Sequence, residues 1–158
     1  MPTLGYLLKH AQLRFSEIAD AALAPLGISG REAAVLRAIS AQPPESQGEI
    51  ARRMGVDRTT MVTLIDGLEA KELVRRRQDP GDRRRNVVEL TDSGRSAVTL
   101  ADDAAARAER EFLRPLPADE AERFRKNLCT LLGDNPGSQP PLGDNPGSPS
   151  PRPLRCVY

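Results

Sequence analysis

Six arginines lie within eleven consecutive residues, 75–85, which read RRRQDPGDRRR. A guanidinium group is always charged, and its fork of N–H donors binds phosphate or carboxylate oxygens in a fixed geometry. Between the two arginine blocks, Pro80 fixes φ and Gly81 permits positive φ, so Asp-Pro-Gly-Asp predicts a tight turn. Such a cluster indicates either a contact with a polyanion or a solvated basic loop, which is what charge runs usually are. The flanking elements decide between these two interpretations.

A β-hairpin is predicted around this turn. The stretch VRRR leads into the turn and NVVEL leads out of it, and Val87 and Val88 favour a strand. The arginines therefore lie on both arms and on the tip of the hairpin.

Two short helices are predicted directly before the hairpin. Ser46 and Glu49 form a capping box that starts the helix QGEIARRM, and Asp57 can cap the helix RTTMVTLIDGLEAKEL. The buried face of the second helix has the spacing i, i+3, i+4 and i+7: Met61, Leu64, Ile65 and Leu68. The opposite face carries Thr59, Thr63 and Asp66, with Arg58 and Val62 on its flank. This pattern is typical of a DNA-binding helix-turn-helix, whose second helix enters the major groove, although helical hairpins that bind nothing are common. A basic two-stranded wing directly after it favours the DNA-binding winged helix.

The outer parts of the chain are predicted to be helices, each with its own apolar stripe. One begins near residue 4, one is capped by Thr91 and runs to about residue 113, and the last covers residues 118–132. Ser29 and Glu32 form another capping box that starts a helix ending near residue 39. The three stripes are Leu4, Leu8, Ala11, Phe15, Ile18 and Ala22; Val98, Ala101, Ala105, Ala108 and Phe112; and Ala121, Phe124, Leu128 and Leu131.

The predicted fold class is mainly α with a small β-wing, a winged helix-turn-helix flanked by N- and C-terminal dimerisation helices. We expect an N-terminal dimerisation helix at 1–28, a DNA-binding domain at 29–91 and C-terminal dimerisation helices at 92–132. Residues 133–158 are rich in Pro, Gly and Ser, so we expect a disordered tail. The stretch LGDNPGS occurs twice, at 132–138 and at 142–148.

Composition narrows the class of protein. The 158 residues carry a net charge of +1, yet residues 46–86 hold ten basic and seven acidic side chains, so positive charge is concentrated in that segment. The sequence has one histidine and two cysteines, and the cysteines do not have the spacing of metal ligands. We therefore expect no bound metal, no cofactor and no enzymatic activity. No signal peptide or membrane-spanning run is present in this sequence, so a cytoplasmic protein with no membrane partner is expected.

At this point the sequence resembles the multiple-antibiotic-resistance regulator (MarR) family of bacterial transcription factors. The resemblance covers about residues 4–132, and its sharpest marker is DPGDRR followed by VVELTDSG. It implies that Asp82 orients Arg84 and that Arg84 enters the minor groove, where a narrow groove attracts arginine. Asp66, which is awkward beside phosphates, is expected to pair with a nearby arginine or to lie beyond the contact zone.

The predicted DNA-binding residues follow from this resemblance and from the charge of the wing. The resemblance implies that Arg58, Thr59, Thr60 and Thr63 face the major groove and that Ser46 and Gln47 contact phosphates. Many members carry a basic residue near position 63, so Thr63 indicates a different base preference. The wing residues predicted to contribute are Arg75, Arg77, Asp82, Arg83, Arg84 and Arg85.

The outer helices imply a partner. Their stripes need cover, and a second copy of the chain is the simplest cover, although they could instead extend one monomer's core. The family resemblance also implies a two-fold dimer, and such a dimer would bind a pseudo-palindromic double-stranded operator. It further implies release by a small aromatic or anionic effector, for which His10 and Arg14, one turn apart, are the candidate ligands.

The expected function is therefore that of a homodimeric transcriptional repressor. The alternative is a winged-helix module that binds proteins and not DNA, although such a module has no need of an arginine-rich wing tip.

Overall fold

The computed structural model describes residues 1–132, which form a mainly helical fold with one two-stranded sheet. Its elements are α1 (Leu4–Leu23), the 3-10 turn η1 (Ala24–Leu26), α2 (Gly30–Ser40), α3 (Gln47–Met54), α4 (Arg58–Ala70), β1 (Val74–Gln78), β2 (Asn86–Leu90), α5 (Asp92–Leu113) and α6 (Ala118–Leu131). The predicted fold class, mainly α with a small wing, is confirmed. The expected disorder of 133–158 concerns residues outside the described part of the chain.

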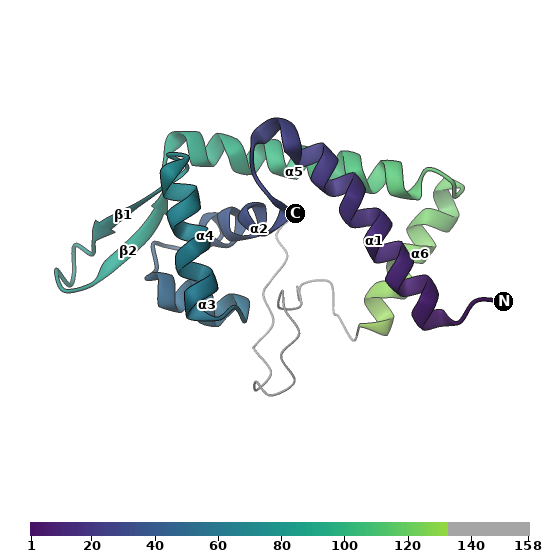
Figure 1. The fold of residues 1–158 in the computed structure, drawn as a ribbon, viewed down its shortest axis with the longest axis horizontal. Helices are drawn as coiled ribbons and strands as arrows, with labels where there is room; N and C mark the ends of the chain where they lie inside the picture. The colour runs from purple at the N-terminus through teal and green to yellow at the C-terminus, as the bar shows by residue number, and fades with distance from the viewer. Residues whose placement is uncertain (133–158) are drawn as a thin grey trace.

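The elements are arranged along α5, the longest helix (Figure 1). The β1–β2 hairpin projects at one end of the molecule, next to α2, α3 and α4. At the other end lie the N-terminal half of α1 and the whole of α6 (Figure 1). The basic wing therefore lies at the opposite end of the molecule from α6 and the N-terminal half of α1.

The helix starts follow from short-range hydrogen bonds that the sequence predicts. Capping boxes are present at Ser29 and Ser46, in which the hydroxyl accepts from an amide three residues on and a glutamate returns to the serine amide. Asp57 and Thr91 cap α4 and α5 with their side-chain oxygens. Gly55 ends α3 with a φ of 65°, a left-handed conformation that favours glycine.

The end of α4 differs from the prediction. The helix was expected to continue to residue 73, but it ends at Ala70, because Glu72 adopts a left-handed φ of 57° and turns the chain into β1. The Nζ of Lys71 leaves the helix to donate to the carbonyl of Gly27 and to the carboxylate of Glu32, each at 2.8 Å. Contacts with distant residues therefore stop the helix where its local sequence would let it continue.

The core consists of apolar side chains from α2, α3, α4, the wing base and α5, together with Leu23 at the end of α1. Met61, Ile65 and Leu68 are fully buried, which confirms the predicted face of α4 apart from the half-buried Leu64. On α5 the most buried alanines are Ala101, Ala104 and Ala108, whereas Ala105, predicted for the stripe, is half-buried. On α1 only Leu23 is buried; of that helix's predicted stripe, Leu4, Leu8 and Phe15 are exposed in a single chain, whereas Ala11, Ile18 and Ala22 are half-buried.

The wing is an antiparallel pair in which Val74 faces Leu90 and Gln78 faces Asn86. Both Val87 and Val88 are buried. The amide of Val88 donates to the carbonyl of Glu45, which adds a bridge on the far side of β2. This bridge anchors the base of the wing to the segment that precedes α3.

Candidate nucleic-acid interface

The exposed face of α4 carries Arg58, Thr59, Thr63 and Asp66, as predicted, while Thr60 is half-buried. Two of the threonine hydroxyls already donate within the helix: Thr60 Oγ1 to Asp57 at 2.5 Å and Thr63 Oγ1 to the carbonyl of Thr59 at 3.2 Å. These threonines therefore present methyl groups and oxygen lone pairs outward. The guanidinium of Arg58 is the cation of this face, because no ion pair involves it within residues 1–132.

The start of α3 lies beside this face, around a hollow of about 340 Å³. Its lining includes Ser46, Gln47, Arg52, Arg58 and Asn86, so it lies between α3, α4 and the wing. The hydroxyl of Ser46 donates to Glu49 at 2.8 Å, and the side-chain oxygen of Gln47 accepts from Arg76 at 3.2 Å. These bonds leave the amide donors of the Gln47 side chain available to an anion, beside the guanidinium groups of Arg52 and Arg58, which form no ion pair among residues 1–132.

The arginines on the arms of the wing are paired with carboxylates. Arg75 and Arg77 both donate to Glu89, their Nε atoms lying 2.7 and 2.5 Å from its two oxygens. The hydrogen bond from Arg77 is the main reason that the pKa of Glu89 lies below its ordinary value of 4.5. Arg85 pairs with Glu49, and its Nη1 lies 3.7 Å from Asp79. Arg85 therefore has its own carboxylate partners, whereas Arg75 and Arg77 share the single charge of Glu89.

The wing tip, residues 79–85, is organised by Asp82. Its carboxylate accepts from the backbone amide of Arg84 at 3.0 Å. Asp82 was expected to orient Arg84: in the chain without DNA it does so at the main chain of the turn, and among residues 1–132 it forms no ion pair with the guanidinium. Arg83 and Arg84 are both exposed, and within residues 1–132 neither forms an ion pair.

Arg76, absent from the predicted site, joins three elements. Its guanidinium bonds to Asp66 at 2.5 Å, to Glu69 and to Gln47, and its amide donates to Glu69 at 3.1 Å. The expectation that Asp66 pairs with a nearby arginine is confirmed. The sequence gives one signal for Arg76: along a strand, its side chain points to the opposite face from those of Arg75 and Arg77. That signal does not show which carboxylates Arg76 contacts.

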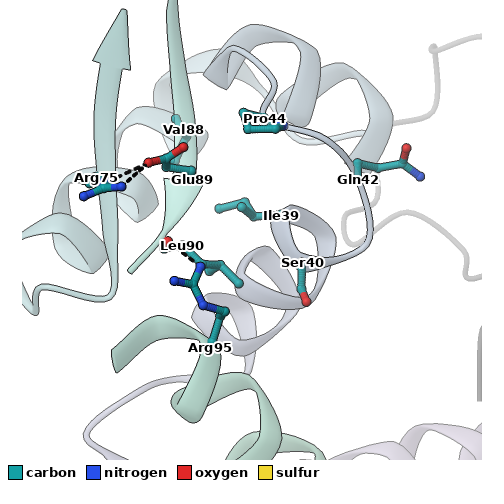
Figure 2. A pocket seen from close by; sticks show the side chains of 9 residues that line it. All are labelled: Ile39, Ser40, Gln42, Pro44, Arg75, Val88, Glu89, Leu90 and Arg95. Atoms are coloured by element: carbon teal, nitrogen blue, oxygen red, sulfur yellow. Dashed lines mark hydrogen bonds and ion pairs between the residues drawn. The ribbon is translucent and has the colours of Figure 1, made fainter. Parts of the chain in front are cut away.

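A second hollow, of about 350 Å³, lies on another side of the wing, lined by residues of α2, the α2–α3 loop, the wing and α5. Figure 2 shows Ile39, Pro44 and Val88 around it, with Arg75 directed to Glu89 and Arg95 directed to the carbonyl of Leu90. Both arginines at this hollow are engaged by protein oxygens, so it offers no free cation to an anionic ligand.

His10 and Arg14, the candidate effector ligands, lie exposed on α1, where the His10 ring packs against Tyr6 with centroids 4.0 Å apart. Cys129 is half-buried on α6. Within residues 1–132 no group of histidine, cysteine and acidic side chains has the arrangement of a metal site, and no helix is both long and apolar enough to cross a membrane.

Comparisons of the sequence and of the fold identify related proteins. The sequence model of the MarR family matches residues 26–85. The HTH-type transcriptional repressor NicR of Pseudomonas putida is 35% identical over 91 residues, 58% of each chain. The HTH-type transcriptional repressor Mb2911 of Mycobacterium bovis is 31% identical over 131 residues, which are 83% of this chain and 94% of that protein.

Two similar structures contain DNA. The transcriptional repressor CouR, bound to a 23-mer duplex, is 34% identical with a TM-score of 0.72, covering 82% of this chain and 92% of CouR. The MarR family protein Rv2887 of Mycobacterium tuberculosis, in complex with DNA, is 30% identical with a TM-score of 0.71, covering 83% and 98%. From its sequence and its fold, the chain therefore belongs to the MarR family of winged helix-turn-helix transcriptional regulators.

Proposed function

We propose that this protein is a DNA-binding transcriptional repressor that places α4 in the major groove and the wing tip in the minor groove of an operator. The observation that carries the proposal is the distribution of free cations. Arg58 on α4 and Arg83 and Arg84 at the tip are exposed without ion pairs among residues 1–132, whereas Arg75 and Arg77 pair with Glu89 and Arg85 pairs with Glu49. Free arginines at a helix face and at a projecting tip suit the two grooves of one duplex.

The relatives support this direction. NicR and Mb2911 are transcriptional repressors, and CouR and Rv2887 have been solved on DNA. For this chain, the contacts we propose come from Arg58, Thr59, Thr60 and Thr63 on α4, Gln47 and Ser46 at α3, and Arg83 and Arg84 on the wing. Asp82 supports them by fixing the turn. No catalytic role is proposed for any residue.

The rival function, a winged helix that binds proteins and not DNA, makes no use of two free arginines at a projecting tip. A mobility shift on DNA flanking the protein's own gene, at two salt concentrations, discriminates the two. Wild type should bind at low salt and weaken steeply as salt rises, because phosphate contacts release counterions. The Arg84→Ala variant should bind at least about fivefold more weakly, since a guanidinium in a groove contributes about 1–3 kcal/mol. Absence of wild-type binding at low salt, by folded protein, would favour the protein-binding alternative.

We also propose that the working form is a homodimer. No residue of α6 is buried in the single chain, and Leu131 is 77% exposed. Leu4, Leu7 and Leu8 are exposed on α1 at the same end of the molecule (Figure 1). Leucines of one region without cover mark an interaction surface. A second copy is the simplest occupant, because a two-fold pair would present two α4 helices and two wings to a pseudo-palindrome.

A further inference from the structure

Arg85 lies where the wing tip returns towards β2, and it is held at both its main chain and its side chain. Its amide donates to the carbonyl of Asp82 at 2.9 Å, and its carbonyl accepts from the amide of Asp79 at 2.8 Å. Its guanidinium pairs with Glu49 on α3 and lies near the carboxylate of Asp79. One residue thus closes the turn and connects the wing to a different element.

The carboxylate that receives Arg85 is itself fixed. Glu49 accepts from the amide and the hydroxyl of Ser46, both at 2.8 Å, in the capping box of α3. These bonds, followed by that from Arg85, hold the pKa of Glu49 below its ordinary value of 4.5, so Glu49 is charged at neutral pH. Exposed ion pairs are usually weak because both side chains lose conformational entropy when the pair forms. Here Glu49 is already held by Ser46, so the pair with Arg85 costs little further entropy at the glutamate.

Arg76 supplies a second connection on the same side of the wing. It joins β1 to α4 through Asp66 and Glu69, and to α3 through Gln47. Arg85 and Arg76 therefore attach the outer and inner parts of the wing to the helix-turn-helix, whereas Arg83 and Arg84 make no such attachment within residues 1–132.

We propose that Arg85 is a positioning residue that fixes the wing relative to α3 through Glu49, and that it does not contact DNA. This inference rests on the proposed function and reassigns one residue that its charge alone would place at the phosphates. A phosphate contact would require Arg85 to leave Glu49 and to strand a carboxylate beside the DNA backbone, which opposes binding.

The test measures fluorescence anisotropy of duplex binding over a series of KCl concentrations, with wild type and three variants, Arg85→Gln, Arg84→Gln and Glu49→Gln. Each protein is measured on a random-sequence duplex and on a duplex selected by the wild type. Arg84→Gln is the matched control, because it removes the same charge from the neighbouring residue. Glu49→Gln keeps an acceptor for the capping box and removes only the charge that holds Arg85.

Arg84→Gln should reduce the slope of log K against log salt by about 0.9, the value for one side-chain charge that displaces a counterion, because a cation in the minor groove lies among the phosphates of both strands. Arg85→Gln should leave that slope unchanged while lowering the selected-to-random affinity ratio by about two- to fivefold, a loss of wing placement that corresponds to one surface ion pair. Glu49→Gln should lower the ratio in the same way. A slope reduced equally by Arg85→Gln and Arg84→Gln would show Arg85 at a phosphate and overturn the inference.

Amide hydrogen exchange of the free protein gives a readout that requires no DNA. Arg85→Gln and Glu49→Gln should accelerate exchange across residues 79–86, and Arg84→Gln should not. Unchanged exchange in Arg85→Gln would overturn the positioning role even if all variants bind DNA. If the wild type binds neither duplex, the proposed function fails, and the exchange result still decides whether Arg85 holds the wing.

Discussion

At the scale of single residues, the six wing arginines divide by their partners. Glu89 takes the two outward arginines of β1, Glu49 takes Arg85, and Asp66 with Glu69 takes Arg76. Arg83 and Arg84 remain free among residues 1–132. Salt bridges at the surface contribute little to stability singly, so their main effect here is geometric: they set which charges face outward and where.

The contact between Glu32 and Lys71 makes stability depend on pH. Burial raises the pKa of Glu32, but hydrogen bonds from Lys71 and from Ser29 outweigh it and hold the pKa below its ordinary value of 4.5. A lowered folded-state pKa means that the stabilisation is present above the unfolded value and is lost as pH falls through the folded value. The free energy of unfolding should therefore fall less steeply below about pH 4.5 in Glu32→Gln than in wild type.

Urea unfolding of both proteins at a series of pH values from about 6 to 3 measures this difference. Glu49, Asp57 and Glu89 also have lowered pKa values, so the wild type will lose stability from several groups at once. The comparison with Glu32→Gln isolates one of them. Parallel curves for the two proteins would contradict the assignment.

At the scale of elements, the joint between α5 and the wing depends on the absence of a side chain at Gly94. A Cβ there would lie 1.9 Å from the carbonyl oxygen of Leu73, which accepts from the amide of Thr91 at 3.1 Å. Gly94→Ala should lower the free energy of unfolding by about 1–3 kcal/mol or more, because backbone must move. Gly48→Ala is the control: its Cβ meets nothing within 4 Å, and alanine in a helix should stabilise by about 0.5–1 kcal/mol. Equal effects of the two substitutions would contradict this account.

The elements whose limits depend on neighbouring residues were predictable from the sequence. Ser46 with Glu49 and Asp57 start α3 and α4 where the capping patterns predicted, because each cap is satisfied within three residues. The end of α4 was not predictable, since Lys71 is drawn to Glu32 and Gly27, which are about forty residues away in the chain. The bridge from Glu45 to Val88 escaped prediction for the same reason.

The site was predictable as a set of residue types and not as a set of roles. The exposed face of α4 and the free tip follow from helix periodicity and turn chemistry. Which arginines are compensated depends on strand register and on the distance between the wing and α3. The pairing of Arg75 with Glu89 follows once β1 and β2 are aligned, but that of Arg85 with Glu49 needs the three-dimensional arrangement.

At the scale of the whole molecule, the proposed dimer surface and the basic wing lie at opposite ends, joined by α5 (Figure 1). Sedimentation should show wild type as a dimer and Leu131→Glu as a monomer or a much weaker dimer, because a charge would enter an apolar interface. Thr130→Glu, which places the same charge about 100° further round α6 and outside the apolar stripe, should remain dimeric. Circular dichroism should show native helix content in both variants. Monomeric wild-type protein would contradict the proposed assembly.

In the proposed assembly, two wings and two α4 helices recognise one duplex. Selection of bound duplexes from a random-sequence pool by the wild-type protein, followed by sequencing, measures this recognition. We expect an enriched pseudo-palindrome whose half-sites lie about 10 bp apart, centre to centre. A folded protein that enriches no motif, or only a single undivided site without two-fold symmetry, would contradict it.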